Sequence, residues 1–508
     1  MANHSQNNKR IAKNTVVLYI RMLVVMGVTL FTSRIVLQAL GVEDFGLYNV
    51  VGGVVGLFAF LRTSMEKCTQ RFLNVEMAKP NGRINDTFCV SVTIHILIML
   101  FILLLAETIG LWFLNAKVNI PEGRELAANW IYQSSVISLC LTLLSVPYSA
   151  TIIAHEKMGF FAVVSIVDAF LKLGIAYLIL VSSLDHLIFY GYLMASVSLI
   201  NFILYMSYCR IKFAETKFRF LFDKELFKNI FGFVSWTLFG QMAILGTNQG
   251  NSILVNMFHS VTANAAMSVG AQVNSAVTSL SSSFQTAFNP QITKSYASND
   301  YEYLKFLVFT TSKISFFLLT MVSIPLAFNI DFVLSVWLKT VPEYSGIFCI
   351  LTLCNGILNS LSAPLNFTVM ATGKIKWFQI VTSVVYLSDL VILYALFSMG
   401  FPPATALVVK VSIMVLVLFV RLHFAHVNVP CIDLISYTKS IILPLASSTA
   451  LSVATAYLMM GWADSALAQI FATCGIIVST FIFMFFIGLS ARERQSLKNT
   501  ITKVLKRK

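Results

Sequence analysis

Long apolar segments follow one another along almost the whole chain, and only short polar turns separate them. A helix needs about 20 consecutive apolar residues to cross a bilayer. The first segment is too long for a secretory signal peptide, and no small-residue cleavage site follows it. We therefore predict an all-α polytopic membrane protein with about fourteen spans, at residues 14–40, 45–61, 86–114, 128–153, 161–181, 187–208, 229–257, 262–288, 306–330, 346–371, 378–398, 404–424, 440–460 and 466–489.

The composition agrees with this pattern. Hydrophobic residues make up 57% of the 508 positions and charged residues only 11%, whereas soluble domains carry about 25% charged residues. This excludes a soluble enzyme, a secreted disulfide scaffold and a disordered chain. The eight cysteines form no C-x-x-C pair and have no His or acidic neighbour at ligand spacing. Neither a metal site nor a disulfide framework is expected.

The net charge of +14 follows the predicted topology. Basic residues concentrate on the cytoplasmic side of membrane proteins. With the N-terminus inside, only Lys117, Arg124 and Lys339 of the 36 Lys and Arg residues fall in outer loops, and five fall within spans. All others fall on the cytoplasmic side. We predict that both termini are cytoplasmic and that no nucleic acid is bound.

The two halves of the chain resemble each other at an offset of 217 residues. The shared pattern is a helix interrupted by Pro, a short basic turn and an apolar helix. Six spans separate the copies, so the repeats run parallel, about an axis along the membrane normal. The aligned pairs include Ser145 with Ser362, Pro147 with Pro364, Thr151 with Thr368, and Lys157 with Lys374.

The repeat predicts two six-helix lobes related by a pseudo-twofold axis, followed by two further helices. Two such lobes are typical of a carrier that opens alternately to either side of the membrane. The predicted parts are a first lobe at 1–208, a basic cytoplasmic linker at 209–228, a second lobe at 229–424, two C-terminal helices at 425–489 and a basic cytoplasmic tail at 490–508.

The chain contains no G-x-x-x-x-G-K-[ST] phosphate-binding loop, so it has no ATPase of its own. An ion gradient, the membrane potential or a substrate gradient must then drive transport. No cofactor is expected beyond a coupling H⁺ or Na⁺. Substrate would bind near the membrane midplane, where Pro-broken helices leave backbone groups unpaired.

Spans seven and eight are unusually polar. Their polar residues step mostly by three or four positions, which places them in one stripe down a helix. Such a stripe lines a hydrated cavity or hydrogen-bonds neighbouring helices. We favour the cavity, because neutral hydroxyl and amide groups suit a large polar substrate such as one that carries sugars. The candidate lining residues are Gln241, Asn248, Asn264, Ser268, Gln272, Ser275 and Ser279.

Charged side chains inside spans are costly and often functional. Arg21 and Arg34 share the first span, and a guanidinium suits a phosphate or diphosphate. The alternative for both is snorkelling or a hydrogen bond to a neighbouring helix. Lys313 and Lys410 lie about two turns from helix ends and could also snorkel.

Two carboxylates within spans are candidates for ion coupling. Asp168 and Lys172 stand four residues apart on one helix face and can pair. The pair either neutralises both charges or forms a switch that substrate or a cation breaks. Asp389 has no partner in its own helix, so it is the better candidate for a carboxylate that binds a proton or a cation.

The N-terminal segments 14–23 and 32–53 resemble the polysaccharide-transporter branch of the MOP exporter superfamily. The most specific element is the turn at 40–48, with the pattern L-G-x-x-D-[FY]-G-x-Y. The likeness is greatest to the O-antigen and capsule repeat-unit flippases of Bacteroidetes-type bacteria. The Ser-x-Pro helices and the span count agree with it over nearly the whole chain.

This resemblance implies a cationic cavity between two lobes and an undecaprenyl-diphosphate-linked oligosaccharide as substrate. The substrate would move from the cytoplasmic to the periplasmic leaflet of the bacterial inner membrane, for O-antigen, lipopolysaccharide or capsule biosynthesis. Partners would be membrane lipid, a polysaccharide polymerase and glycosyltransferases. The two extra helices resemble those that form a lipid-tail groove in relatives that flip lipid II.

Those relatives carry cavity arginines on the first, second and eighth helices. Here Arg21, Arg34 and Arg62 correspond to the first two helices, whereas the eighth has no basic residue. Lys313 is the nearest substitute there, and Lys172 completes the candidate contacts to the diphosphate.

Two other functions stay open. A cation-coupled multidrug exporter of the same superfamily would need acidic cavity residues, whereas bases within the spans outnumber acids here. A membrane polysaccharide polymerase or ligase would need a large outer loop with catalytic residues, and the outer loops at 115–127 and 331–345 are short. We therefore expect a transporter and not an enzyme.

Overall fold

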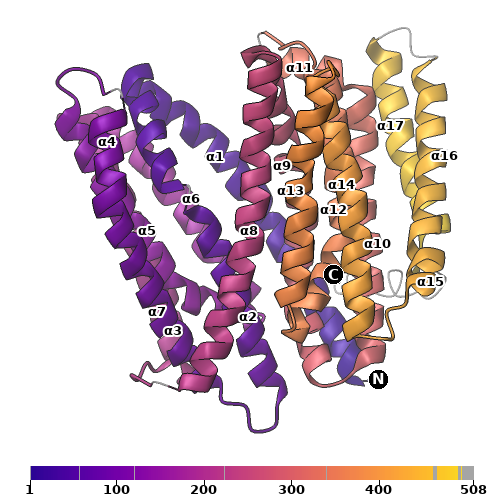
Figure 1. The fold of residues 1–508 in the computed structure, drawn as a ribbon, viewed down its shortest axis with the longest axis horizontal. Coiled ribbons are helices and arrows are strands. Elements are labelled where there is room, and N and C mark those ends of the chain that lie inside the picture. The colour runs from indigo at the N-terminus through magenta and orange to yellow at the C-terminus, as the bar shows by residue number, and fades with distance from the viewer. Residues whose placement is uncertain are drawn as a thin grey trace, which may run out of the picture. The chain divides into compact units, whose positions relative to one another are not determined.

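The computed structural model describes residues 2–56, 58–118, 120–221, 223–338, 340–461, 466–489 and 493–494. Regular structure in these residues is helical throughout (Figure 1). The chain forms two compact units, which we call the N-terminal unit (Ala12–Leu238) and the C-terminal unit (Met1–Ile11 with Phe239–Lys508). The predicted tail lies outside the described residues except for 493–494.

The core of the N-terminal unit forms around α5, which packs against α2, α3, α6 and α7. Ile131, Tyr132, Ile179 and Leu187 are buried there. The elements of this unit are α1 (Ala2–Gly56, from Ala12 on), α2 (Ala59–Ala78), α3 (Ile84–Leu105), the π-helical turn η1 (Ala106–Gly110), α4 (Leu111–Lys117), α5 (Glu125–Ala154), α6 (Met158–Val181), α7 (His186–Lys212), the 3₁₀ turn η2 (Ala214–Thr216) and the start of α8 (Lys224–Phe258).

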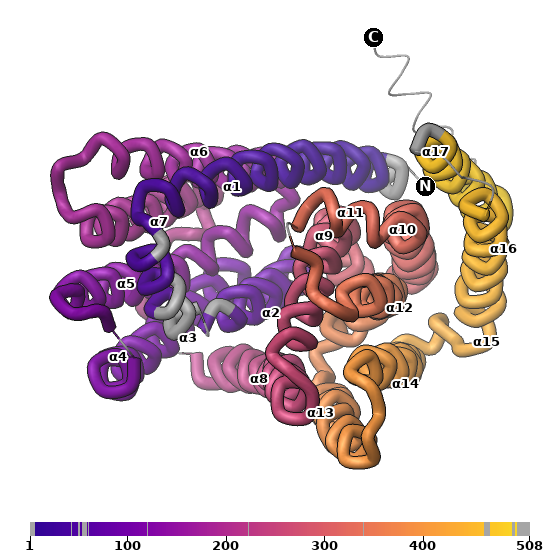
Figure 2. The backbone as a smooth tube through the Cα atoms, turned by 90° about the horizontal axis from the view of Figure 1, so that it is seen from above, coloured from indigo at the N-terminus to yellow at the C-terminus, as the bar shows by residue number. Residues whose placement is uncertain are grey.

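In the C-terminal unit α12 packs against α9, α10 and α14, while α16 and α17 pack on each other and on α10 (Figure 2). The elements that follow α8 are α9 (Val261–Ala297), α10 (Tyr301–Phe328), α11 (Ile330–Trp337), α12 (Ser345–Thr372), α13 (Lys376–Ser398), α14 (Thr405–Asn428), α15 (Leu434–Tyr437), η3 (Thr438–Ile442), α16 (Leu443–Met460), α17 (Ala466–Phe483) and η4 (Met484–Gly488).

The prediction of an all-helical membrane protein is confirmed. Within the described residues, twelve helices are long and apolar enough to cross a membrane. Two predicted spans fall outside that set. The span at 45–61 corresponds to the end of α1 and the start of α2, and the span at 262–288 lies in α9. The first is divided between two helices and so forms no single long apolar helix, whereas the polar side chains of α9 lower the hydropathy of the second.

The prediction of a loop after the second span is wrong in its first part, because α2 continues to Ala78. Charged residues make this stretch resemble a cytoplasmic loop. However, it is amphipathic: Met65, Cys68 and Leu73 are fully buried, and α2 packs on α5. The outer segment 331–345 likewise begins in the short helix α11.

The predicted repeat has a structural counterpart in each unit. Pro147 lies within α5 and Pro364 within α12, and each helix leads through a short turn into the next. Four residues after the proline, the hydroxyl of Thr151 donates to the carbonyl of Pro147 at 2.7 Å. Thr368 donates to the carbonyl of Pro364 in the same way, at 2.9 Å. The aligned threonines thus bond to the carbonyl of the proline in both copies.

The motif at 40–48 contains a kink in α1 and one part of an ion-pair network of Asp44, Arg124 and Asp185, which we call the clamp. Gly41 has φ 74°, in the left-handed region that favours glycine. Just beyond it, Asp44 pairs with Arg124, which also donates to Asp185. Burial disfavours the charge on Asp185, but the N–H of Ile188 and the guanidinium outweigh it, so the pKa of Asp185 lies below its usual value. The clamp fastens α1, α5 and α7 together.

Candidate functional site

Charged side chains from three helices surround Tyr205, a residue of α7 that is 5% exposed. Arg21 from α1, Arg62 and Glu66 from α2, and Asp168 from α6 all lie close enough to interact with it electrostatically. We call these five residues the Tyr205 cluster. Two of the predicted arginines and one predicted carboxylate therefore come together within the N-terminal unit.

The guanidinium of Arg21 stacks on an aromatic ring and keeps one buried donor without a partner among the described residues. Its charged group lies over the ring of Phe161, 4.8 Å from the centroid. Its buried Nε has no hydrogen-bond partner among the described residues. The nearby carboxylate of Glu66 accepts a hydrogen bond of 2.8 Å from Ser149. Because an unpaired buried donor is costly, an anion that accepts from Arg21 would be favoured here.

The predicted pair of Asp168 and Lys172 is formed, at 2.8 Å. Asn201 of α7 donates to the other carboxylate oxygen at 2.7 Å. Asp168 is thus held between a cation and an amide, with Tyr205 nearby. With Lys172 included, the cluster holds three bases and two acids, which leaves it with a net positive charge.

A pocket of about 270 Å³ adjoins the cluster, and Arg62 belongs to both. Its wall is mixed, with apolar side chains, two glycines, one aromatic ring and a row of hydroxyl groups from α5. The lining residues are Tyr48, Gly52, Arg62, Ile131, Ser134, Ser135, Ser138, Leu139, Thr142, Gly191 and Met194.

In the C-terminal unit the predicted polar stripe lies along one side of α9. Ser268, Gln272 and Ser275 are exposed. Val269 and Val277 are buried on another side of the helix. Among the remaining stripe residues, Asn264 and Ser279 are half-buried, and Asn264 accepts a hydrogen bond from Ser252 at 2.7 Å. An exposed polar side on a long membrane helix is consistent with a hydrated cavity, and its lining role stays a prediction.

The predicted lining residues of α8 differ in their contacts. Gln241 is half-buried, and Asn248 is exposed and accepts a hydrogen bond of 2.7 Å from Lys410 of α14. One turn further, Asn251 donates to Asp389 of α13 at 2.7 Å. Asp389 is 1% exposed. Lys410 is close enough to interact with it electrostatically.

Two acceptor oxygens in this group have no partner among the described residues, namely Oδ1 of Asp389 and Oδ1 of Asn251. Buried acceptors are normally paired. A proton on the carboxylate, or a cation bound between the two oxygens, would satisfy them. Asp389 therefore has the surroundings expected of an ion-coupling residue, and that role stays a prediction.

Two predicted anion contacts are not among the residues of the Tyr205 cluster. Lys313 belongs to the C-terminal unit, where it forms a buried ion pair of 2.8 Å with Glu493. Arg34 is exposed on α1, and none of the described contacts pairs it with an acid. The sequence does not indicate the Glu493 contact, because the two residues are 180 positions apart.

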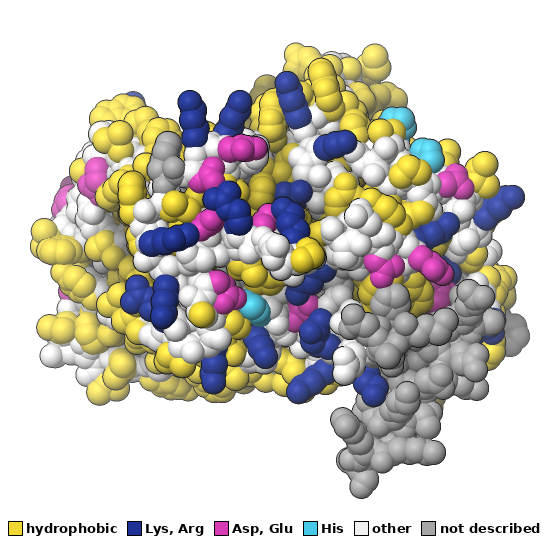
Figure 3. Space-filling view, turned by 90° about the horizontal axis from the view of Figure 1, so that it is seen from below, with side chains coloured by type: hydrophobic (Ala, Val, Ile, Leu, Met, Phe, Trp, Pro, Cys, Tyr) yellow, Lys and Arg dark blue, Asp and Glu magenta, His cyan; other side chains and the backbone are white. Residues whose placement is uncertain are grey.

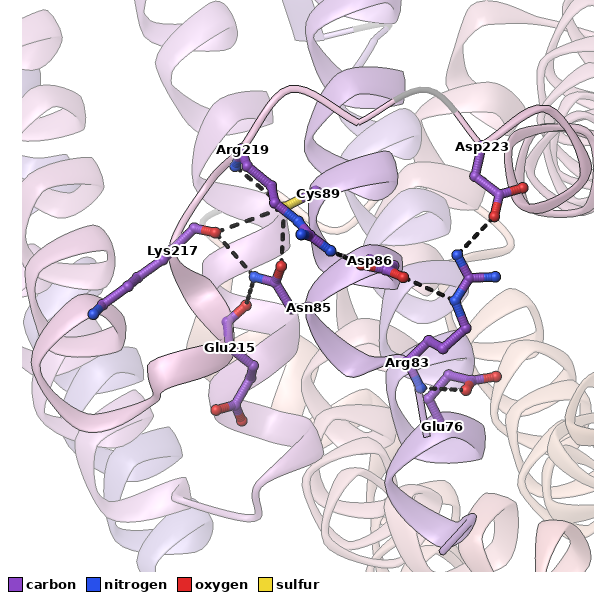
Figure 4. A network of polar contacts seen from close by, with 9 residues as sticks. All are labelled: Glu76, Arg83, Asn85, Asp86, Cys89, Glu215, Lys217, Arg219 and Asp223. Atoms are coloured by element: carbon purple, nitrogen blue, oxygen red, sulfur yellow. Dashed lines mark hydrogen bonds and ion pairs between the residues drawn. The ribbon is translucent and has the colours of Figure 1, made fainter. Parts of the chain in front are cut away.

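The basic linker is fastened to the start of α3 (Figure 4). Arg83 pairs with Asp86 and with Asp223, each at 2.8 Å. Arg219 also pairs with Asp86. The side chain of Asn85 donates to two linker carbonyls, at 2.7 and 2.9 Å. The N–H of Leu226 and the guanidinium of Arg83 hold the pKa of Asp223 below its usual value.

Sequence reasoning missed three buried or central polar residues. Glu66 and Tyr205 belong to the cluster, but Glu66 falls in the stretch taken for a loop, and nothing in the sequence marks Tyr205. The sequence places Arg421 at the cytoplasmic end of the predicted span at 404–424 but does not indicate its burial. It lies within α14, is 7% exposed, and donates to Ser362 at 2.6 Å and to Asn359 at 3.0 Å.

Residues 11–296 match the model of a protein family described as "Polysaccharide biosynthesis protein". No curated protein matches the chain.

Several solved structures share the fold. One is an outward-facing multidrug resistance MATE family transporter of the MOP superfamily, with a TM-score of 0.70, 11% identity, and coverage of 84% of this chain and 98% of that chain. Another is a MOP superfamily transporter from Pyrococcus furiosus, described by the reverse polarity of its binding pocket. It has a TM-score of 0.68 and 11% identity, and the match covers 83% of this chain and 96% of that chain. A MATE structure in the bent conformation has a TM-score of 0.69 and 10% identity, and the match covers 84% of this chain and 97% of that chain. At these identities the likeness shows the fold.

Proposed function

Since the chain belongs to the polysaccharide biosynthesis protein family and has the fold of MOP-superfamily transporters, we propose that it is a flippase for lipid-linked oligosaccharides. Its substrate is an undecaprenyl-diphosphate-linked repeat unit, which it moves from the cytoplasmic to the periplasmic leaflet by alternating access. The product serves O-antigen, capsule or another surface polysaccharide.

The Tyr205 cluster is the observation that carries this proposal. Arg21 and Arg62 come together from different helices, and Arg21 keeps a buried donor without a partner among the described residues. Guanidinium groups suit a diphosphate, because each presents several donors to its oxygens. Lys172 adds a third positive charge near the same site. Glu66 balances part of this charge when no substrate is bound.

The polar residues of the C-terminal unit support other parts of the cycle. The exposed amide and hydroxyl groups of α9 offer adaptable hydrogen bonds to sugars. Asp389, with its unpaired oxygen, and Asp168 are the carboxylates proposed to couple transport to H⁺ or Na⁺. A charged group inside a membrane protein is costly, which favours a functional reason for keeping it.

The distribution of charge supports the proposed orientation in the bacterial inner membrane. Figure 3 shows many Lys and Arg side chains on one face of the molecule. The positive-inside rule assigns such a face to the cytoplasm, together with both termini. The proposed protein partners, a polymerase and glycosyltransferases, would act on the two sides of the membrane.

A cation-coupled multidrug exporter is the second candidate, since the MATE structures share the fold. Positive substrates of such an exporter would be repelled by a cluster of net positive charge. This favours an anionic substrate for the present chain.

The test is flipping of a fluorescent polyprenyl-diphosphate oligosaccharide in proteoliposomes, read by quenching from outside. We expect the double variant Arg21→Ala/Arg62→Ala to lose nearly all transport, and Arg21→Lys to keep part of it. Lys79→Ala serves as a matched control, because Lys79 is largely exposed and the pair that the described residues give it is with the nearby Glu76. Full transport by the double variant, or export of cationic drugs without any flipping, would overturn the proposal.

A further inference from the structure

The pocket next to the Tyr205 cluster has the size of a subsite. Ligand sites for drug-sized molecules measure about 300–1,000 Å³, whereas this pocket measures about 270 Å³. It can hold one ring of a ligand, but a whole oligosaccharide repeat would not fit. Because Arg62 lies in its wall and also in the cluster, a ring bound here would lie beside a group bound to the arginines.

The hydroxyl groups of α5 are oriented as acceptors. Ser135 donates to the carbonyl of Ile131, and Ser138 to that of Ser134, both at 2.8 Å. Each serine has thereby used its one proton and keeps lone pairs for a ligand. Two acceptors at neighbouring positions suit a ligand that carries several hydroxyl donors. An apolar drug would leave these groups unpaired.

Another part of the wall suits the carbon face of a sugar. The ring of Tyr48 is fixed by an edge-to-face contact with Tyr190, with centroids 5.0 Å apart. A fixed aromatic ring offers a flat surface that is apolar in the middle and polar at its tip. A pyranose has the same division between apolar C–H groups and hydroxyls. Gly52 faces this ring and leaves space beside it.

Gly191 brings the floor of the pocket close to α5. A Cβ atom there would come within 2.8 Å of Ile131 and 3.1 Å of Ser134. Glycine therefore allows α7 to pack tightly on α5. The pocket is thus bounded by packed helices on its floor and by hydroxyl groups on its side.

From these features we infer that the pocket binds the sugar ring attached directly to the diphosphate. The inference rests on the proposed flippase function and adds a subsite to it. The diphosphate binds the arginines of the Tyr205 cluster, and the first sugar occupies the pocket. The remaining sugars extend beyond it. Selectivity for the repeat unit would then depend on its first sugar.

The experiment compares two synthetic substrates in proteoliposomes, undecaprenyl diphosphate alone and the same lipid with one N-acetylhexosamine. For the unaltered protein we expect faster flipping of the sugar-bearing lipid. Ser138→Leu fills the pocket, and Ser135→Ala/Ser138→Ala removes the two acceptors. We expect either change to lower the preference for the sugar-bearing lipid about tenfold, and to leave flipping of the bare diphosphate unchanged.

Ser196→Leu is the matched control, because Ser196 is an exposed serine of α7 outside the pocket. Flipping of the bare diphosphate also reports whether a variant is folded. Unchanged sugar preference in both pocket variants would overturn the subsite while leaving the flippase intact. An equal loss of flipping for the bare and the sugar-bearing lipid would also overturn the subsite. If the unaltered protein moves neither lipid, the proposed function itself fails.

Discussion

Removal of either partner of the buried Lys313–Glu493 ion pair should destabilise the C-terminal unit strongly. The side chains are only 5% and 9% exposed, and the charged atoms lie 2.8 Å apart. If Lys313 becomes Met, the buried carboxylate of Glu493 loses the ammonium group that lies 2.8 Å from it. Breaking a buried pair in this way costs about 3–5 kcal/mol. We expect Lys313→Met and Glu493→Met each to lower the free energy of unfolding by about that amount.

The double variant Lys313→Met/Glu493→Met should be much less destabilised than either single variant. Replacing a whole buried pair by apolar groups is often neutral, because no charge is then left without a partner. The comparison pair is Lys79 and Glu76, in which the lysine is 52% exposed. For Lys79→Met we expect a loss of only about 0.2–1 kcal/mol.

The assay is equilibrium unfolding in mixed detergent micelles, combined with the flipping assay for each variant. The reasoning is refuted if Lys313→Met is no more destabilising than Lys79→Met, or if the effects of the two single changes simply add. A further result separates structure from function. If Lys313→Met is stable but does not transport, while Glu493→Met is stable and does transport, Lys313 contacts substrate, as its sequence position suggests.

Three other predictions follow from contacts described above. Gly41→Ala should lower the melting temperature measured in detergent, since alanine at φ 74° costs about 1 kcal/mol. The stability that the clamp at Asp185 contributes should be fully present above the ordinary pKa of an aspartate and be lost as the pH falls below it. When unfolding is followed from pH 6 to pH 3, the unaltered protein should therefore lose stability more steeply than Asp185→Asn. Asp389→Asn should abolish the dependence of flipping on an imposed H⁺ or Na⁺ gradient while leaving downhill exchange, and unchanged gradient dependence would exclude the coupling role.

The sequence predicts the helices well because bilayer thickness sets one length for every span. This rule fails where a helix is polar for a structural reason. The stretch from Arg62 to Ala78 is helical although it reads as a loop, because its apolar side packs on α5 and its polar side carries part of the Tyr205 cluster. The burial of Arg421 is likewise not evident from the sequence, because the groups that accept from its guanidinium, Ser362 and Asn359, belong to α12.

The candidate site could be predicted only in part. A charge inside an apolar span stands out in the sequence, so Arg21, Asp168 and Lys172 could be identified as candidates. Which charges meet depends on how helices pack, and the sequence spacing does not contain that information. The cluster therefore gains Glu66 from the stretch read as a loop. Lys313 instead pairs with Glu493, at the far end of the chain.

The two units are joined by continuous helix at both of their connections. The first falls between Ile11 and Ala12 within α1, and the second between Leu238 and Phe239 within α8. The basic linker ends within the first turns of α8 and belongs to the N-terminal unit, where Arg83 and its partners hold it at the start of α3 (Figure 4). In the proposed alternating-access cycle the linker would therefore move with that unit. The bending required for transport would then occur inside α1 and α8, because helices that connect two moving parts must deform where they leave one part and enter the other.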